Sequence, residues 1–273
     1  MNELFANPAI QAGLAPFLAA LMVSAPLRRT RLLGLAITVA FAMVIALTIG
    51  FSFESLTSVR KLVIVGLAAS VATLVLDMTT SGRPRVVTAA LAAAAAGAAV
   101  WVVLRVLQQQ AAAPALLAGT GAALYLAALV GSTRHIGADS VRAAACASLL
   151  GLGSGALALL GASALLAQIG IAIGAGAGAT LLVQMLAGRP APVGSTLALT
   201  ASVVAGLVGL LAVFTGSLPW YCLLPTLAVP WIARLVPGGE RPLWLTAIIT
   251  AFMALIPMLL AVGLAWFTAG AST

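Results

Sequence analysis

Charged residues are scarce in this chain, and their scarcity indicates whether water or lipid surrounds it. Asp, Glu, Lys and Arg make up 7% of the 273 residues, whereas hydrophobic residues make up 63%. The mean hydropathy is +1.21. The surface of a water-soluble domain needs roughly a quarter to a third of charged positions. The composition therefore excludes a soluble globular domain and predicts a chain that lies mostly in lipid.

Reactive groups are equally rare. The chain has one histidine, two cysteines and five acidic residues. A metal site needs a set of His, Cys or acidic ligands, and nucleophilic catalysis needs a base beside the nucleophile. Cys146 and Cys222 lie in apolar runs without CxxC spacing and are expected to be small buried hydrophobes. We therefore expect no metal and no cofactor, and an enzyme is the least favoured function.

Long apolar runs make up most of the chain. Each is close to the ~20 residues that cross a bilayer as a helix. The unbroken stretch 150–186 is divided near Gly161–Ser163, because a single helix of that length would overshoot the membrane. The predicted fold is an all-α integral membrane protein with about ten transmembrane helices, at residues 9–27, 32–51, 61–78, 86–107, 111–131, 142–162, 164–187, 193–216, 219–236 and 242–268.

The basic residues predict the orientation. Alternate loops hold ten of the 13 basic residues, while Arg60, Lys61 and Arg105 lie on the other side. Cytoplasmic loops carry the excess of Lys and Arg, so both termini are predicted outside. Because the net charge of +8 resides in loops between apolar runs, nucleic acid is not an expected partner. The Arg, Ala and Gly content is typical of GC-rich bacteria, which predicts a multi-pass protein of the bacterial cytoplasmic membrane surrounded by membrane lipids.

An internal duplication is the most informative pattern. Residues 72–84 read ATLVLDMTTSGRP, and residues 179–190 read ATLLVQMLAGRP, which aligns Asp77 with Gln184 at an offset of 107. A weaker copy of the opening hairpin recurs near the C-terminus. An even number of spans in each copy makes the two copies parallel. The predicted units are a first four-span repeat, a second four-span repeat and a C-terminal hairpin, at residues 1–108, 109–216 and 217–273.

Four polar residues in the repeats are candidates for a substrate path or gate. Asp77 is the one acid inside an apolar run and pairs with Gln184 in the second copy; Lys61 pairs with Gln168. An ionisable residue within a membrane helix is a functional candidate by default. Asp77 and Lys61 are about 24 Å apart along one helix, however, so they cannot form a pair. The alternative is that each is a terminal residue whose side chain reaches the headgroup layer.

Two further motifs have both a functional and a purely structural interpretation. The twin Gly-Arg-Pro turns place Arg83 and Arg189 at the inner interface, as contacts to headgroups or substrate or as mere orientation signals. Gly170, Gly174 and Gly178 recur at four-residue spacing, which favours close helix packing and leaves a cavity lined by backbone as the alternative.

Two functions remain open from the sequence. The first is a permease or exporter for a small apolar, amphiphilic or lipid-like solute, whose path lies between the repeats. The second is a non-catalytic scaffold or assembly subunit, whose partners are other membrane subunits or a second copy of the chain. A carrier should contain a polar cavity deep in the membrane, and a scaffold should co-purify with other chains.

Overall fold

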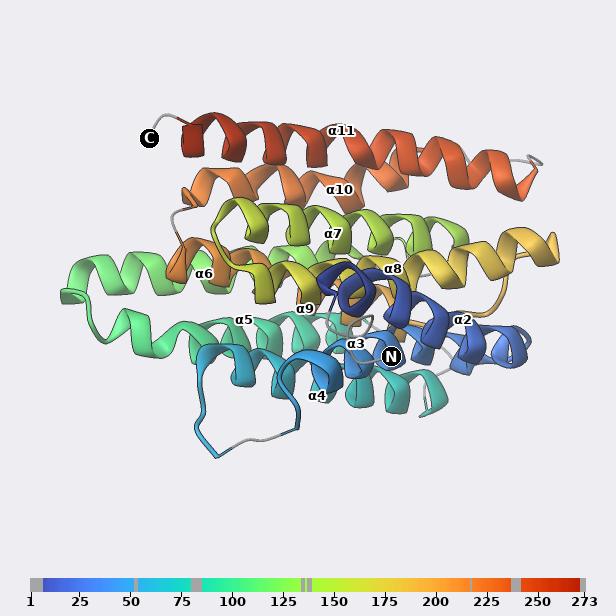
Figure 1. The fold of residues 1–273 in the computed structure, drawn as a ribbon, viewed down its shortest axis with the longest axis horizontal. Coiled ribbons are helices and arrows are strands. Elements are labelled where there is room, and N and C mark those ends of the chain that lie inside the picture. Colours follow the sequence, from blue (N-terminus) through green and yellow to red (C-terminus); the bar gives the residue numbers. More distant parts are fainter. Residues whose placement is uncertain are drawn as a thin grey trace.

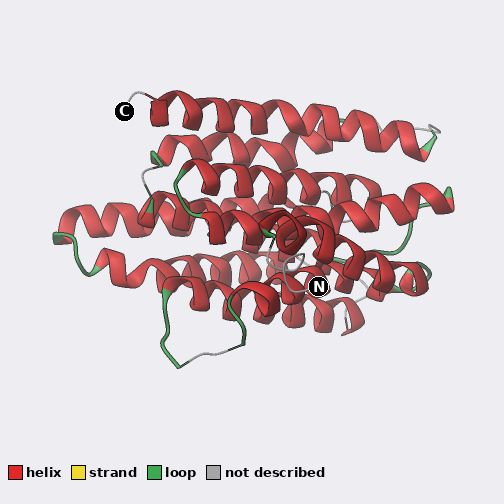
Figure 2. Cartoon of the chain, in the orientation of Figure 1, coloured by secondary structure: helices red, strands yellow, loops and turns green. Residues whose placement is uncertain are grey.

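The fold is a helical bundle whose long helices run roughly along one direction (Figure 1). The computed structural model describes residues 7–51, 54–79, 85–133, 136, 139–216, 218–236 and 242–270, and every regular element in these segments is helical (Figure 2). In chain order the elements are η1 (Ile10–Leu14), α2 (Ala15–Leu27), η2 (Arg31–Gly34), α3 (Leu35–Thr48), α4 (Ser58–Thr79), α5 (Arg85–Leu107), α6 (Ala112–Thr133), α7 (Ser140–Leu160), α8 (Ala164–Ala187), α9 (Thr196–Thr215), η3 (Trp220–Leu223), α10 (Leu224–Leu235) and α11 (Leu243–Gly270).

Nine helical segments in the described part of the chain are long and apolar enough to cross a membrane. The protein is therefore a multi-span helical membrane protein, as predicted. The remaining expected span, 219–236, is shorter: the four-residue turn η3 leads into α10, which has only 12 residues and contains Pro230. Twelve residues rise about 18 Å, which is less than the ~30 Å hydrocarbon core.

The division of the longest apolar stretch is confirmed. α7 ends at Leu160, and α8 begins at Ala164. Ala162 in the turn adopts a left-handed backbone with φ of 64°. The Ser163 hydroxyl accepts a hydrogen bond of 3.4 Å from the backbone N–H of Leu166, which caps α8. A three-residue turn thus reverses the chain without a long loop.

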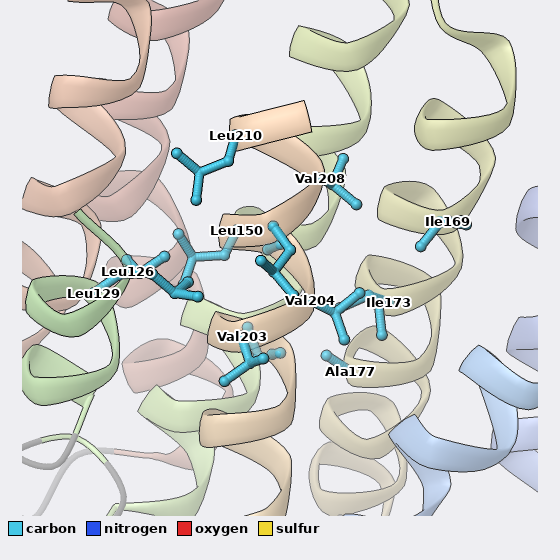
Figure 3. Packing of buried hydrophobic residues seen from close by; sticks show 14 of the residues in the cluster. Leu126, Leu129, Leu150, Ile169, Ile173, Ala177, Val203, Val204, Val208 and Leu210 are labelled. Carbon is cyan, nitrogen blue, oxygen red and sulfur yellow. The ribbon is translucent and has the colours of Figure 1, made fainter. Parts of the chain in front are cut away.

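α9 is the central helix of the bundle. Residues 196–212 of this helix are buried on all sides, as expected for a helix surrounded by other helices. Its side chains pack in several directions, for example Val203 and Val204 (Figure 3). The core around it is aliphatic and draws on α6, α7 and α8, through residues such as Leu126, Leu150 and Ile173.

The two ends of the bundle can be told apart by their contacts. At one end, Asp77 late in α4 bonds to Ser195 at the start of α9, and Gln184 late in α8 bonds to Ser140 at the start of α7. We call this the Asp77 end. At the other, Lys61 in the first turn of α4 bonds to the carbonyl of Trp101 in α5. We call this the Lys61 end.

α7 and α8 touch along their backbones. A Cβ added at Gly170 would lie 2.5 Å from the backbone nitrogen of Gly155, and one at Gly174 would lie 2.7 Å from the backbone nitrogen of Leu152. Real Cβ atoms do not approach other atoms this closely, so only glycine permits the contact. Gly178 differs, because its nearest neighbour would be the Ser148 hydroxyl at 3.8 Å. Gly170 and Gly174 therefore occupy a helix-packing seam, and Gly178 lies beyond its tightest part.

Candidate functional site

Asp77 joins the first predicted repeat to the second. Its carboxylate accepts hydrogen bonds from the backbone N–H and the hydroxyl of Ser195, and from the backbone N–H and the hydroxyl of Thr196, at 2.5 to 3.0 Å. These groups form the N-terminus of α9, which carries the positive end of the helix dipole. A carboxylate there satisfies orphan donors and is stabilised by the dipole. Asp77 is thus a helix cap supplied by another helix.

Gln184, the repeat partner of Asp77, holds the same connecting segment from the other side. It is buried, and its side-chain carbonyl accepts from the Ser140 hydroxyl at 2.7 Å and from the backbone N–H of Ala191 at 3.2 Å. Asp77 and Gln184 therefore fasten the two halves of the connection between α8 and α9. Both polar candidates are engaged with protein groups at one end of the bundle.

Lys61 lies at the opposite end and is buried, with 6% of its surface exposed. Its ammonium donates to the carbonyl oxygen of Trp101 at 3.0 Å and lies 5.2 Å from the centre of the Trp101 ring. Gln168, its repeat partner, is half-buried near the start of α8. The four candidate path residues thus do not converge on one site.

The second Gly-Arg-Pro turn has the predicted local structure. Gly188 follows α8 with φ of 65°, the left-handed conformation that favours glycine, and Arg189 is exposed after it. The first turn, Gly82–Pro84, lies outside the described residues, and Arg83 with it.

A hollow of about 640 Å³ opens at the Asp77 end. It lies between the start of α7, residues 190–194 and the start of α11. Asp139 on its wall caps α7 by accepting from the backbone N–H groups of Val141 and Arg142, and its carboxylate lies 3.0 Å from the Arg142 guanidinium. Asp139 is therefore occupied by its own helix and by Arg142.

A larger hollow of about 960 Å³ is apolar and lies between α6, α9 and the η3–α10 segment. We call it the apolar groove. Polar groups occur at its edge, at Gln110 in the α5–α6 connection and at Trp220 in η3. Its apolar lining includes Pro114, Leu117, Gly121 and Leu124 from α6, Leu210, Val213 and Phe214 from α9, and Leu223, Leu224 and Leu227 from η3 and α10.

A hydrogen-bonded pair closes the deep side of the apolar groove. The Tyr125 hydroxyl lies 2.9 Å from the Thr226 hydroxyl, and the Thr226 hydroxyl also lies 2.7 Å from the carbonyl oxygen of Leu223. Because a threonine hydroxyl has one proton and here gives it to that carbonyl, Tyr125 is the donor in the pair. The packing beneath, which includes Leu150 and Met258, leaves no space for a water molecule.

The groove exists because α10 is short. α6 has 22 residues and rises about 33 Å, almost twice the rise of α10. In Figure 1, α6 extends well beyond the start of α10. The exposed Trp220 and the half-buried Tyr125 line the space that a full-length helix would fill.

The groove was not predicted from the sequence. The signal that could have indicated it is the pair of prolines, Pro225 and Pro230, in the short predicted span 219–236. The lining of the groove lies within residues 110–227, between the second predicted repeat and the hairpin. For a carrier, the sequence predicts a polar cavity between the two repeats, whereas this hollow is apolar and lies between the second repeat and the hairpin.

Comparison of the chain with protein-family models, with curated proteins and with solved structures finds no match. The functional assignment therefore depends on the geometry described above.

Proposed function

We propose that the protein is a carrier of the bacterial cytoplasmic membrane that takes a single-chain amphiphile into the apolar groove. The observation that carries this proposal is the size and lining of the groove: about 960 Å³, apolar along its length, with polar groups at its edge. Ligand pockets of proteins commonly measure 300–1,000 Å³ with few polar groups that orient the ligand.

The length of the groove fits one leaflet. Its α6 wall runs from Pro114 to Ala128, a rise of about 21 Å. Half of the ~30 Å hydrocarbon core is about 15 Å. An apolar chain that entered at Gln110 and Trp220 would therefore reach beyond the middle of the bilayer. The polar part of the amphiphile would remain at the edge, beside the Gln110 amide and the Trp220 indole.

The Tyr125–Thr226 pair is the barrier that a transport cycle has to open. Tyr125 comes from the second predicted repeat and Thr226 from the hairpin, so movement of the hairpin against α6 would break one hydrogen bond of 2.9 Å. Interhelical hydrogen bonds in membranes contribute only about 0.6 kcal/mol on average. Such a closure is weak enough to open in every cycle.

The parallel repeats and the orientation with both termini outside belong to this proposal. Support comes from Asp77 and Gln184, which are equivalent in the two copies and lie at the same end of the bundle. Arg189 and Arg142 lie at that end too, which by the positive-inside bias is the cytoplasmic one.

A groove-filling substitution tests the proposal. Gly121 lines the groove, and a Cβ there would meet nothing within 4 Å, so Gly121→Leu fills the space without a clash. Gly97 on α5 is equally open and lies outside the groove, so Gly97→Leu is the matched control. We expect Gly121→Leu to weaken binding of a spin-labelled lysophosphatidylcholine in nanodiscs about tenfold, because the bound chain loses its contacts with the lining.

Transport is measured on the same variants in proteoliposomes, as movement of the labelled amphiphile between leaflets. Faster movement with the wild type and Gly97→Leu, but not with Gly121→Leu, supports the carrier. Equal binding by Gly121→Leu and Gly97→Leu would show that the amphiphile does not bind in the groove. Binding without movement, together with co-purification of other chains, would favour the membrane scaffold.

A further inference from the structure

The Lys61 end of the bundle holds a buried positive charge that the proposed carrier function does not use. Lys61 lies in the first turn of α4, where the helix dipole is positive and a cation is unfavourable. Within the described residues, the ion pair that meets a 4.0 Å limit is Arg142–Asp139, at the other end. Among the described residues, Lys61 is therefore buried at the start of a helix without an acidic partner within 4.0 Å.

The ammonium of Lys61 is only partly satisfied. It carries three donors, and the Trp101 carbonyl oxygen accepts one at 3.0 Å. The Trp101 ring, 5.2 Å away, adds a cation–π contact. A buried cation is costly unless an anion or several acceptors compensate it. The other two donors of the ammonium have no hydrogen-bond acceptor among the described residues.

Arg105 is a second cation at the Lys61 end. It is exposed in the last turn of α5, one helical turn after Trp101, whose carbonyl oxygen binds Lys61. Side chains on a helix tilt toward its N-terminus, which favours a position of the Arg105 side chain near the turn that contains Trp101. The N-terminus of α4 adds partial positive charge at this end, and within its first turn the N–H groups of Arg60 and Lys61 already donate to the hydroxyl and the carbonyl oxygen of Thr57.

The acid nearest in sequence does not neutralise this cluster. Glu54 is exposed in the connection before α4 and forms no ion pair within 4.0 Å with a described residue. Arg60 donates instead to the carbonyl oxygen and the hydroxyl of Ser55, at 2.8 and 2.6 Å. Arg60 is thus occupied, and Lys61 and Arg105 are left as the pair of cations.

We infer that Lys61, Arg105 and the start of α4 bind a phosphate group, namely that of an anionic phospholipid in the leaflet at the Lys61 end. Phosphate suits the site because its several oxygens accept from an ammonium, a guanidinium and helix N–H groups together. The exposed edge of the Trp101 ring lies beside them, as aromatic rings do at headgroup level. A lipid rather than free phosphate fits because both helices are membrane spans. The lining of the apolar groove includes neither Lys61 nor Arg105.

The test is lipid-dependent thermal unfolding of the full-length protein in detergent. Phosphatidylglycerol is titrated into wild type, and phosphatidylcholine and inorganic phosphate serve as separate arms. We expect phosphatidylglycerol to raise the Tm, and Lys61→Gln or Arg105→Gln to increase its apparent Kd about five- to tenfold. Gln is the residue that the second copy carries at position 168.

Two further variants distinguish binding from folding. Lys61→Arg keeps the charge and should keep the response to phosphatidylglycerol. Arg234→Gln removes an exposed charge in the last turn of α10, at the opposite end, and should leave that response unchanged. A wild-type response in both Lys61→Gln and Arg105→Gln, or loss of the response in Arg234→Gln, would overturn the site. An equal Tm rise with inorganic phosphate would keep the phosphate site but exclude a lipid as its ligand.

Discussion

The α7–α8 seam and the apolar groove are built from the same kinds of residue but have opposite packing. In the seam, Gly151, Gly155, Gly170 and Gly174 bring two helix backbones into contact. In the groove, Gly121 on α6 faces open space. The difference does not arise from composition, because both regions are apolar and contain glycine. It arises from whether a neighbouring helix is long enough to cover the glycine.

The same substitution should therefore have opposite effects in the two regions. In the seam, Gly174→Leu forces α7 and α8 apart, because its Cβ alone would lie 2.7 Å from the Leu152 nitrogen. Overpacking of a tight core typically costs about 1–3 kcal/mol and backbone contacts more, so we expect more than about 3 kcal/mol. The measurement is the unfolding free energy in mixed micelles titrated with SDS. Gly178→Leu, in the same helix with 3.8 Å of clearance, is the control and should cost much less. Equal losses would mean that the seam is not tight.

The second largest effect is expected at the polar cap of α9, the helix that lines the groove and packs against both helices of the seam. Asp77→Asn keeps the size of the side chain but removes its charge and one acceptor from the N-terminus of α9. The expected loss of unfolding free energy is about 1–3 kcal/mol. Glu54→Gln removes a charge from an exposed loop and should change stability by less than about 0.5 kcal/mol.

Asp77→Asn also decides between a cap and a gate. A cap predicts lower stability with transport per folded molecule unchanged, measured in proteoliposomes. If the transport rate of Asp77→Asn falls by more than its fraction of folded protein, Asp77 acts as a gate.

A smaller effect is expected from the closure of the groove. Tyr125→Phe removes the hydroxyl that donates to Thr226. Because an interhelical hydrogen bond in a membrane contributes about 0.6 kcal/mol, the loss of stability should be of that size. If the pair is the barrier, the rate of amphiphile movement should rise in this variant. A slower rate would show that the hydroxyl contacts the substrate rather than closing the groove.

The smallest effect on stability is expected in the apolar groove, for the same kind of substitution that disrupts the seam. Gly121→Leu should change the unfolding free energy by less than about 0.5 kcal/mol, because the new side chain enters open space. A loss as large as that of Gly174→Leu would mean that a segment of the protein already fills the groove.

Much of the fold could be predicted because each span is a local property. A run of eighteen or more apolar residues forms a helix in lipid, because a helix satisfies all its backbone hydrogen bonds within the segment. The predicted limits of 164–187 agree with α8. The predicted ninth span, 219–236, corresponds to η3 followed by α10, of which only the 12 residues of α10 are α-helical. Boundaries elsewhere differ by a few residues, because helix ends depend on caps that other helices supply.

The candidate site was less predictable, because polar partners come from distant positions. Nothing near Asp77 in the sequence indicates Ser195 and Thr196, which lie more than 100 residues away. Lys61 was singled out as a membrane charge, but its contact with Trp101 depends on how α4 and α5 are aligned. Four residues chosen for their chemistry proved to be distributed over both ends of the bundle.

The sequence by itself determined the solvent, the helical class and the approximate spans, because hydropathy and backbone hydrogen bonding act on each segment separately. The tertiary structure alone decided which glycines are covered, which helix Asp77 caps and where a hollow remains. Those outcomes depend on the relative lengths and crossings of helices far apart in the chain. A 12-residue α10 beside a 22-residue α6 leaves space that no local pattern encodes.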